Sequence, residues 1–487
     1  MKFWKNKIIK NKETLIYIVI TIAFFGIFSS IEYALDTYAT FSFSIQDLYN
    51  QFVSCGRFFI VLVGFLLKLF NINDELCYFL SFILAILCMI ISQYKLYNII
   101  KKDIKCEKLR IIVPTLIVLN IFSIELFLFI EKGIMVFSIL MCICGVEAII
   151  KVFDKKEKKY IIFALAYMLF ANFSYQGVTG IFIAISLIYI IKYSKNKKEF
   201  VFNNIIVALV YGIPSLIDYI LIRVLSVGSR VSGDIVLFES IKKIIKSTIN
   251  MVITTYDLLP KYLYIVLFSI IIIILIWQIS LQKERKLSQI FKIAYISAGV
   301  IAATIFPQIM QNTDSIWFVP RSTYPYATLY GILVLYLLMN YDLNDFLQKI
   351  VIVLSIILLI FQFYSFNKIL TDRYKVNAID YEITKMICEY IDKYEKTTGN
   401  EIKKIAIYKD QSPEYSYNGI FISGDINLKA YAKEWSVLYI INYYYNRMLT
   451  PAEIDSQKQE EFNKRNWTSF SNEQLIFEED TLHFCMY

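Results

Sequence analysis

The stretch 32–59, EYALDTYATFSFSIQDLYNQFVSCGRFF, places carboxylates, hydroxyls and an arginine between two apolar blocks. A carboxylate can take a proton from a reacting hydroxyl, and a guanidinium can hold a phosphate in its planar fork. These residue types therefore suit acid–base chemistry on a substrate that carries an anionic group. The candidate residues of this stretch are Glu32, Asp36, Asp47 and Arg57.

Three later polar segments supply compatible side chains. They are SYQG (174–177), SVGSRVSGD (226–234) and PQIMQNTDSIWFVPRSTYPY (307–326). Amide, guanidinium and aromatic groups suit the recognition of polar ligands that carry an anion. The candidate substrate-binding residues of these segments are Gln176, Arg230, Trp317 and Arg321.

Each candidate also has an explanation that involves no substrate. Asp36 can cap the helix that follows it, and the arginines can extend toward lipid headgroups. Gln176 can satisfy the backbone of a tight turn, and Trp317 suits the aromatic belts of membrane proteins. The residue types alone leave both explanations open.

Composition places these segments in a membrane protein. Of the 487 residues 57% are hydrophobic, whereas soluble domains have about 45–50% apolar residues. The apolar residues form blocks of about twenty, the length that a helix needs to cross a bilayer. The net charge of +9 comes from lysines in short loops, so it indicates membrane orientation and not nucleic-acid binding.

The predicted fold is an α-helical polytopic membrane protein with about eleven transmembrane helices and a small extracytoplasmic α/β domain at the C-terminus. If the short segment 58–71 lies at the interface, all basic loops fall on the side of the N-terminus, as the positive-inside rule requires. The N-terminus is then cytoplasmic, and the polar segments share the outer face. The predicted spans are 14–34, 77–94, 111–129, 134–150, 160–174, 178–191, 201–224, 262–281, 289–306, 324–340 and 347–366.

Two charged residues, Asp218 and Arg223, lie inside the predicted span 201–224. Charges at this depth are rare and usually functional. A spacing of five residues does not place them on one helix face. Each is therefore expected to find a partner on another element.

The composition changes after Phe366, which divides the chain into a transmembrane domain, 1–366, and a polar domain, 367–487. The first outer loop with its interfacial helices occupies 32–76. In the polar domain, YEITKMICEYIDKY and EWSVLYIINYYYN have helical patterns, and KKIAIYK predicts a short buried strand. LIFEEDTLHFCMY predicts a hairpin around Glu479–Asp480.

The sequence gives no sign of a metal or cofactor. Its eight cysteines have no paired spacing and it has one histidine, so no His/Cys zinc site is expected. It contains no glycine-rich phosphate loop, and the candidate residues lie opposite the cytosolic nucleotides. Nucleotide-driven chemistry is therefore not expected.

Four short motifs follow one another in order: ALDTY (34–38), SCGRFF (54–59), YQG (175–177) and PRS (320–322). Their order and sidedness resemble the glucosyltransferase II (Gtr-type) family of bacterial membrane enzymes, which belongs to the GT-C class. The resemblance covers most of the chain. It implies transfer of a sugar, typically glucose, from an undecaprenyl-phosphate donor to a surface polysaccharide outside the plasma membrane.

The resemblance gives the candidate residues specific roles. Inverting displacement of a lipid phosphate needs a general base for the acceptor hydroxyl, and Asp36 at the end of the first span is the candidate. Arg57 and Arg321 would hold the departing phosphate, with Arg230 third. Family members often have paired acidic residues in the first loop, whereas Asp36 here has only Glu32 nearby. The implied partners are the polyprenyl-phosphate-sugar donor, the polysaccharide acceptor and membrane lipid, without nucleic acid.

Two other functions share some of these features. A polysaccharide polymerase or ligase would also use lipid-linked substrates, but a large outer loop in mid-chain is typical of such proteins. A flippase or transporter would favour charges near mid-membrane and a repeat that relates two halves. The largest polar outer segment here is the C-terminal domain, and the sequence shows no repeat, which favours the transferase.

Overall fold

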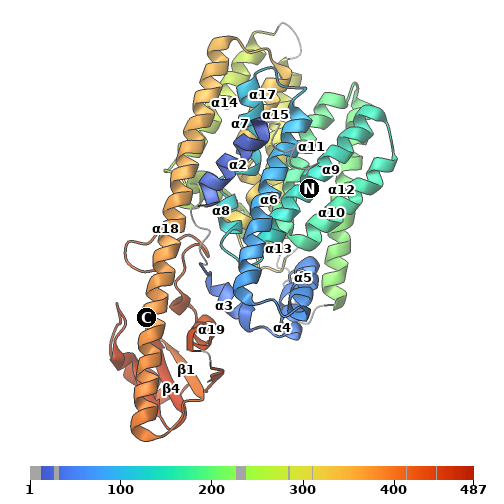
Figure 1. Cartoon of the computed structure of the whole chain (residues 1–487). Coiled ribbons are helices and arrows are strands. Elements are labelled where there is room, and N and C mark those ends of the chain that lie inside the picture. The colour runs from blue at the N-terminus through green and yellow to red at the C-terminus, as the bar shows by residue number, and fades with distance from the viewer. Residues whose placement is uncertain are drawn as a thin grey trace. The chain divides into compact units, whose positions relative to one another are not determined.

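The computed structural model forms two compact units, drawn in Figure 1. It describes residues 12–26, 32–225, 237–282, 286–309, 311–412, 414–445 and 447–487. The helical unit comprises Met1–Ser29, Ile45–Phe127 and Glu131–Phe366. The C-terminal unit comprises Ser30–Ser44, Leu128–Ile130 and Asn367–Tyr487.

Apolar helices build the helical unit. Within the described ranges, seven helical segments are long and apolar enough to cross a membrane. The structure thus confirms a mostly helical chain with apolar helices of membrane-spanning length. The seven segments are α6 (Asp74–Ile100), α9 (Lys132–Lys155), η2 with α11 (Gln176–Tyr193, α11 itself Gly180–Tyr193), α12 (Lys197–Leu225), α14 (Leu263–Ser280), α15 (Lys286–Ile309) and α18 (Asp345–Thr398).

Two of these segments, α9 and η2–α11, form the centre of the helical unit. In each, 72% of the most apolar window is buried, against 28–39% in the other five. Helix α9 packs against α6, α11 and α10 (Lys159–Ser174), so it can be apolar on every side. The outer helices leave large apolar side chains exposed, as Leu209 and Leu216 of α12 are. Soluble proteins avoid such patches, whereas lipid would cover them.

Shorter helices complete the helical unit. Helix α5 has 12 residues, which is too short to cross about 30 Å of hydrocarbon alone. It packs against α4, which forms from the amphipathic part of the polar stretch. The other helices of this unit are α2 (Lys12–Phe25), α4 (Ile45–Val53), α5 (Phe58–Leu69), α7 (Glu107–Val118), α8 (Ser123–Leu126), the 18-residue amphipathic α13 (Leu237–Thr254), η3 (Thr255–Asp257), η4 (Pro320–Ser322), α16 (Tyr324–Ala327) and α17 (Leu329–Asn340).

Two of the predicted spans are wrong in extent. Helix α2 ends at Phe25 and residues 32–34 are not helical, so 14–34 is not one helix. The predicted span 111–129 is interrupted between α7 and α8. There the Asn120 side chain donates to the Ile117 carbonyl at 3.1 Å and accepts from the Phe122 N–H at 3.0 Å. Such bonds from side chain to backbone compete with the helix ladder.

Two further helices differ from the prediction. The segment between the predicted spans 201–224 and 262–281, for which no helix was predicted, contains the amphipathic helix α13. Helix α18 does not end near 366 but continues to Thr398, so that the whole helix has 54 residues. The segment 345–398 contains neither glycine nor proline, and Gly399, at φ +79°, ends the helix by bonding the Glu395 carbonyl at 2.8 Å.

The C-terminal unit contains a four-stranded sheet in the order β2-β1-β4-β3. Strand β1 pairs in parallel with β2 and β4, and β3 pairs antiparallel with β4 across the turn Glu479–Asp480. The predicted strand, hairpin and second helix are thereby confirmed. The elements are β1 (Lys404–Lys409), β2 (Thr450–Pro451), β3 (Leu475–Glu478), β4 (Thr481–Met486), α3 (Leu35–Ser42), α19 (Glu434–Tyr445), α20 (Ser456–Phe462) and the end of α18.

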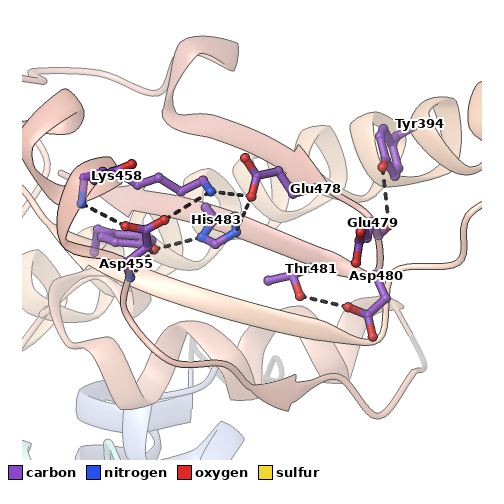
Figure 2. A network of polar contacts seen from close by, with 10 residues as sticks. Tyr394, Asp455, Lys458, Glu478, Glu479, Asp480, Thr481 and His483 are labelled. Carbon is purple, nitrogen blue, oxygen red and sulfur yellow. Dashed lines mark hydrogen bonds and ion pairs between the residues drawn. The ribbon is translucent and has the colours of Figure 1, made fainter.

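The face of the sheet near the hairpin carries a network of charges, shown in Figure 2. Lys458 forms ion pairs with Asp455 and Glu478, and Nε2 of His483 lies 3.8 Å from Glu478. The His483 Nδ1 atom lies 2.8 Å from the hydroxyl of Tyr408. Burial lowers the pKa of His483 below its usual value, and the charge of Lys458 adds to this effect. The imidazole is therefore neutral at pH 7 and serves the packing of β4.

Candidate functional site

A cavity of about 360 Å³ lies within the helical unit. Its walls come from four parts of the sequence: the turn before α5, the η2 turn, helix α12, and the segment from the end of α15 to η4. Four of the predicted substrate-binding residues line it together with the carboxyl group of α12. These five residues are Arg57, Gln176, Asp218, Trp317 and Arg321.

Arg57 reaches the cavity from the N-cap position of α5. Its Nη1 forms an ion pair with Oε1 of Glu131 at 3.0 Å, and the guanidinium carbon lies 4.9 Å from the ring centroid of Tyr175. Only 15% of the Arg57 side chain is exposed. The geometry therefore places the guanidinium inside the protein, which does not favour a headgroup anchor.

Arg321 lies in η4, and the carboxylate of Glu125 binds it at two points. Glu125, which is fully buried in α8, accepts from the Arg321 backbone N–H and from its Nη1, both at 2.7 Å. This two-point bond holds the main chain and the side chain of Arg321 at once. A buried carboxylate needs such a cation, so the pair sets the direction of the guanidinium at the cavity wall.

Asp218 is the third ionisable side chain of the cavity, and only 4% of it is exposed. Its Oδ2 accepts from Nε2 of Gln176 at 2.9 Å. The same amide nitrogen also donates to the carbonyls of Cys55 and Gly56, both at 3.1 Å. Gln176 thus joins the α12 carboxylate to the turn that carries Arg57, which supplies the partner expected for Asp218.

Gly56 makes this close approach possible. Its φ is +72°, and a Cβ at this position would lie 2.4 Å from Nε2 of Gln176 and 2.8 Å from Oδ2 of Asp218. A larger residue would therefore have to displace both side chains, besides adopting a strained backbone. The glycine of SCGRFF is required by the geometry of the site.

Aromatic side chains also line the cavity. Trp317 leaves 51% of its surface exposed, and its backbone N–H donates to Oε1 of Gln308 at 3.1 Å. Tyr175 and Tyr211 are buried on the inner side. Flat apolar faces next to charged groups suit a ligand that has hydroxyls on one side and C–H groups on the other.

The structure does not bring every predicted residue to this cavity. Asp36, in the first turn of α3, and the buried Glu32 belong to the C-terminal unit. Asp47 is exposed on α4, and Arg230 lies outside the described residues. The role of Asp36 as a general base stays a prediction.

Sequence reasoning did not single out Glu125 and Glu131. Both lie in or next to an apolar run, where a carboxylate is costly unless it is paired. The energetic cost of an unpaired carboxylate in an apolar run could have marked both glutamates as candidates, as it marked Asp218. The predicted span 111–129 concealed it for Glu125, because a carboxylate near a span end is easily placed at the membrane surface.

Among the described residues, no group of three or more histidine, cysteine or acidic side chains could hold a metal ion. Comparison with protein-family models, with curated proteins and with solved structures finds no match to this chain. The geometry itself offers two oriented guanidiniums, a buried carboxyl group and an aromatic wall. Such a cavity can bind an anionic group and an adjacent hydroxyl-bearing group together.

Proposed function

We propose that this protein is an inverting glycosyltransferase of a bacterial plasma membrane. It would move a sugar, glucose by the resemblance, from an undecaprenyl-phosphate donor to a surface polysaccharide on the outer face. One observation carries the proposal: Arg57 and Arg321, far apart in the sequence, line the same cavity as Asp218 and Trp317. The guanidiniums suit the donor phosphate, and the carboxyl group and the indole suit the sugar.

The charges of the cavity also limit how it would bind the donor. Each arginine already has a carboxylate partner, Glu131 or Glu125. A guanidinium has five N–H donors in a fixed plane, so it can bind a phosphate oxygen while it keeps its carboxylate. The two carboxylates then position the guanidiniums. Each carboxylate also balances the charge of its own arginine while the monoanionic phosphodiester is bound.

The accompanying topology is part of the proposal. The chain would cross the membrane eleven times, with α5 at the interface and with 14–34 and 111–129 crossing as interrupted helices. The N-terminus and the basic loops then lie in the cytoplasm and the C-terminal unit outside. A phosphatase reporter fused after Tyr487 is then expected to be active, and one inserted at Lys156 inactive. An inactive reporter at Tyr487 would mean that the segment 58–71 crosses the membrane, and the outer-face location of the cavity would be lost.

The activity itself is tested with the full chain in liposomes. The protein is expected to transfer radiolabelled glucose from undecaprenyl-phosphate glucose to a polysaccharide extracted from the source cells, without nucleotide or added metal. Omission of the acceptor should abolish the labelled polysaccharide. Chain growth without label transfer from the monosaccharide donor would indicate a polymerase or ligase. Label that crosses the liposome membrane on its lipid would indicate a flippase.

A further inference from the structure

The two carboxyl oxygens of Asp218 differ in their hydrogen bonding. Its Oδ2 is held by Gln176, whereas Oδ1 is buried and has no hydrogen-bond partner among the described residues. Leaving a buried polar atom without a hydrogen bond destabilises a protein. Because the residue lines a cavity, the missing partner can come from whatever occupies that cavity.

We propose that Oδ1 of Asp218 accepts a hydrogen bond from a hydroxyl group of the sugar in this cavity, with Gln176 as its positioning residue. The inference rests on the proposed function, which it deepens by naming the group that distinguishes a sugar-carrying lipid from its bare phosphate. Asp218 is then a specificity residue for the sugar, while Arg57 and Arg321 act on the phosphate. The division of roles follows from the chemistry of the three side chains.

The fixed orientation of Gln176 determines which oxygen of Asp218 is available to a sugar hydroxyl. Its Nε2 donates to two backbone carbonyls as well as to Asp218, so the amide cannot rotate without breaking those bonds. Asp218→Asn would therefore have to turn its carbonyl oxygen toward Gln176. Its NH₂ group would then face the cavity, where it cannot accept the hydrogen bond that the sugar hydroxyl donates to Oδ1; the hydroxyl would have to turn and give up the geometry of the parent site.

The test compares two lipids on the purified full chain in detergent. Undecaprenyl-phosphate glucose and undecaprenyl phosphate are titrated against the parent, Asp218→Asn and the control Asp345→Asn, whose side chain is exposed at the start of α18. Asp218→Asn is expected to bind the glucose-bearing lipid about 10- to 100-fold more weakly, the range for a mismatched buried hydrogen-bonding group. Its affinity for undecaprenyl phosphate should stay within error of the parent, and Asp345→Asn should match the parent for both lipids.

Other outcomes separate this inference from the proposed function. If the parent binds the glucose-bearing lipid and Asp218→Asn binds it equally well, Oδ1 is not a sugar ligand, although the function stands. Equal loss for both lipids would mean that Asp218 only positions the turn of Arg57, which also overturns the inference. A parent that binds neither lipid overturns the function and the inference together.

A second variant keeps the test possible if Asp218→Asn does not fold. Asp218→Leu removes the unsatisfied carboxyl group and fits an apolar helix, so it should insert and elute as a single species even if the asparagine variant does not. It is expected to show the same selective loss for the glucose-bearing lipid. Retained selectivity in Asp218→Leu would overturn the proposal by itself.

Discussion

Asp36→Asn is expected to lower the rate of sugar transfer about 10²–10⁴-fold, the usual contribution of a general base. Asparagine keeps the size and polarity of aspartate but cannot take the proton of the acceptor hydroxyl. The change should leave the fold intact, because Asp36 lies in the first turn of α3 and is half-buried. Losing a charge in the first turn of a helix removes a helix-dipole interaction of about 0.3–1 kcal/mol.

The measurement compares Asp36→Asn with Glu32→Gln and Asp47→Asn at equal membrane abundance, scoring glucose transferred from the lipid carrier. Asp47 is exposed on α4 and should tolerate its change much better than Asp36 does. An active Asp36→Asn beside an inactive Glu32→Gln or Asp47→Asn would show that the wrong carboxylate was chosen. If all three variants are active, the first loop is not the catalytic centre, and Asp218 becomes the next carboxylate to test.

The apolar helices could be read from the sequence because hydrocarbon sets both their length and their composition. The hairpin around Glu479–Asp480 was equally accessible, since alternating strands flank a two-residue turn. Composition could not show that α18 passes from an apolar to a polar part without a break. The end of an apolar block marks where lipid or core ends, whereas a helix ends only where capping or a residue such as Gly399 stops it.

Part of the candidate site could also be predicted from the sequence. Arg57, Gln176 and Arg321 stood out because polar side chains near apolar blocks are costly. Their grouping around one cavity depends on tertiary packing, which no local pattern encodes. The bond from Gln176 to Asp218 joins residues 42 positions apart. It required the close approach at Gly56, and a single glycine in a sequence does not reveal what approaches it.

Arg57→Lys and Arg321→Lys are each expected to lower kcat/KM about 10- to 100-fold while the protein still inserts and folds. Lysine keeps the positive charge, so the Glu131 and Glu125 carboxylates are not left buried without a cation. It loses the planar fork, and with it the bond that would span guanidinium and phosphate; a bond to a charged group contributes about 1.5–3 kcal/mol. Arg321→Ala should behave differently, because the fully buried Glu125 then loses its side-chain partner. Breaking such a pair costs about 3–5 kcal/mol of stability.

The Lys variants are assayed for transfer, and their folding is followed by thermal unfolding in detergent. Arg223→Lys is the matched control, since Arg223 is exposed on α12 with its guanidinium over the Tyr219 ring, 5.1 Å from the centroid. It should keep the parent's kcat/KM. Near-normal turnover in both Arg57→Lys and Arg321→Lys would mean that these arginines serve only to neutralise their carboxylates. The donor phosphate would then have to be held elsewhere, with Arg230 as the next residue to replace.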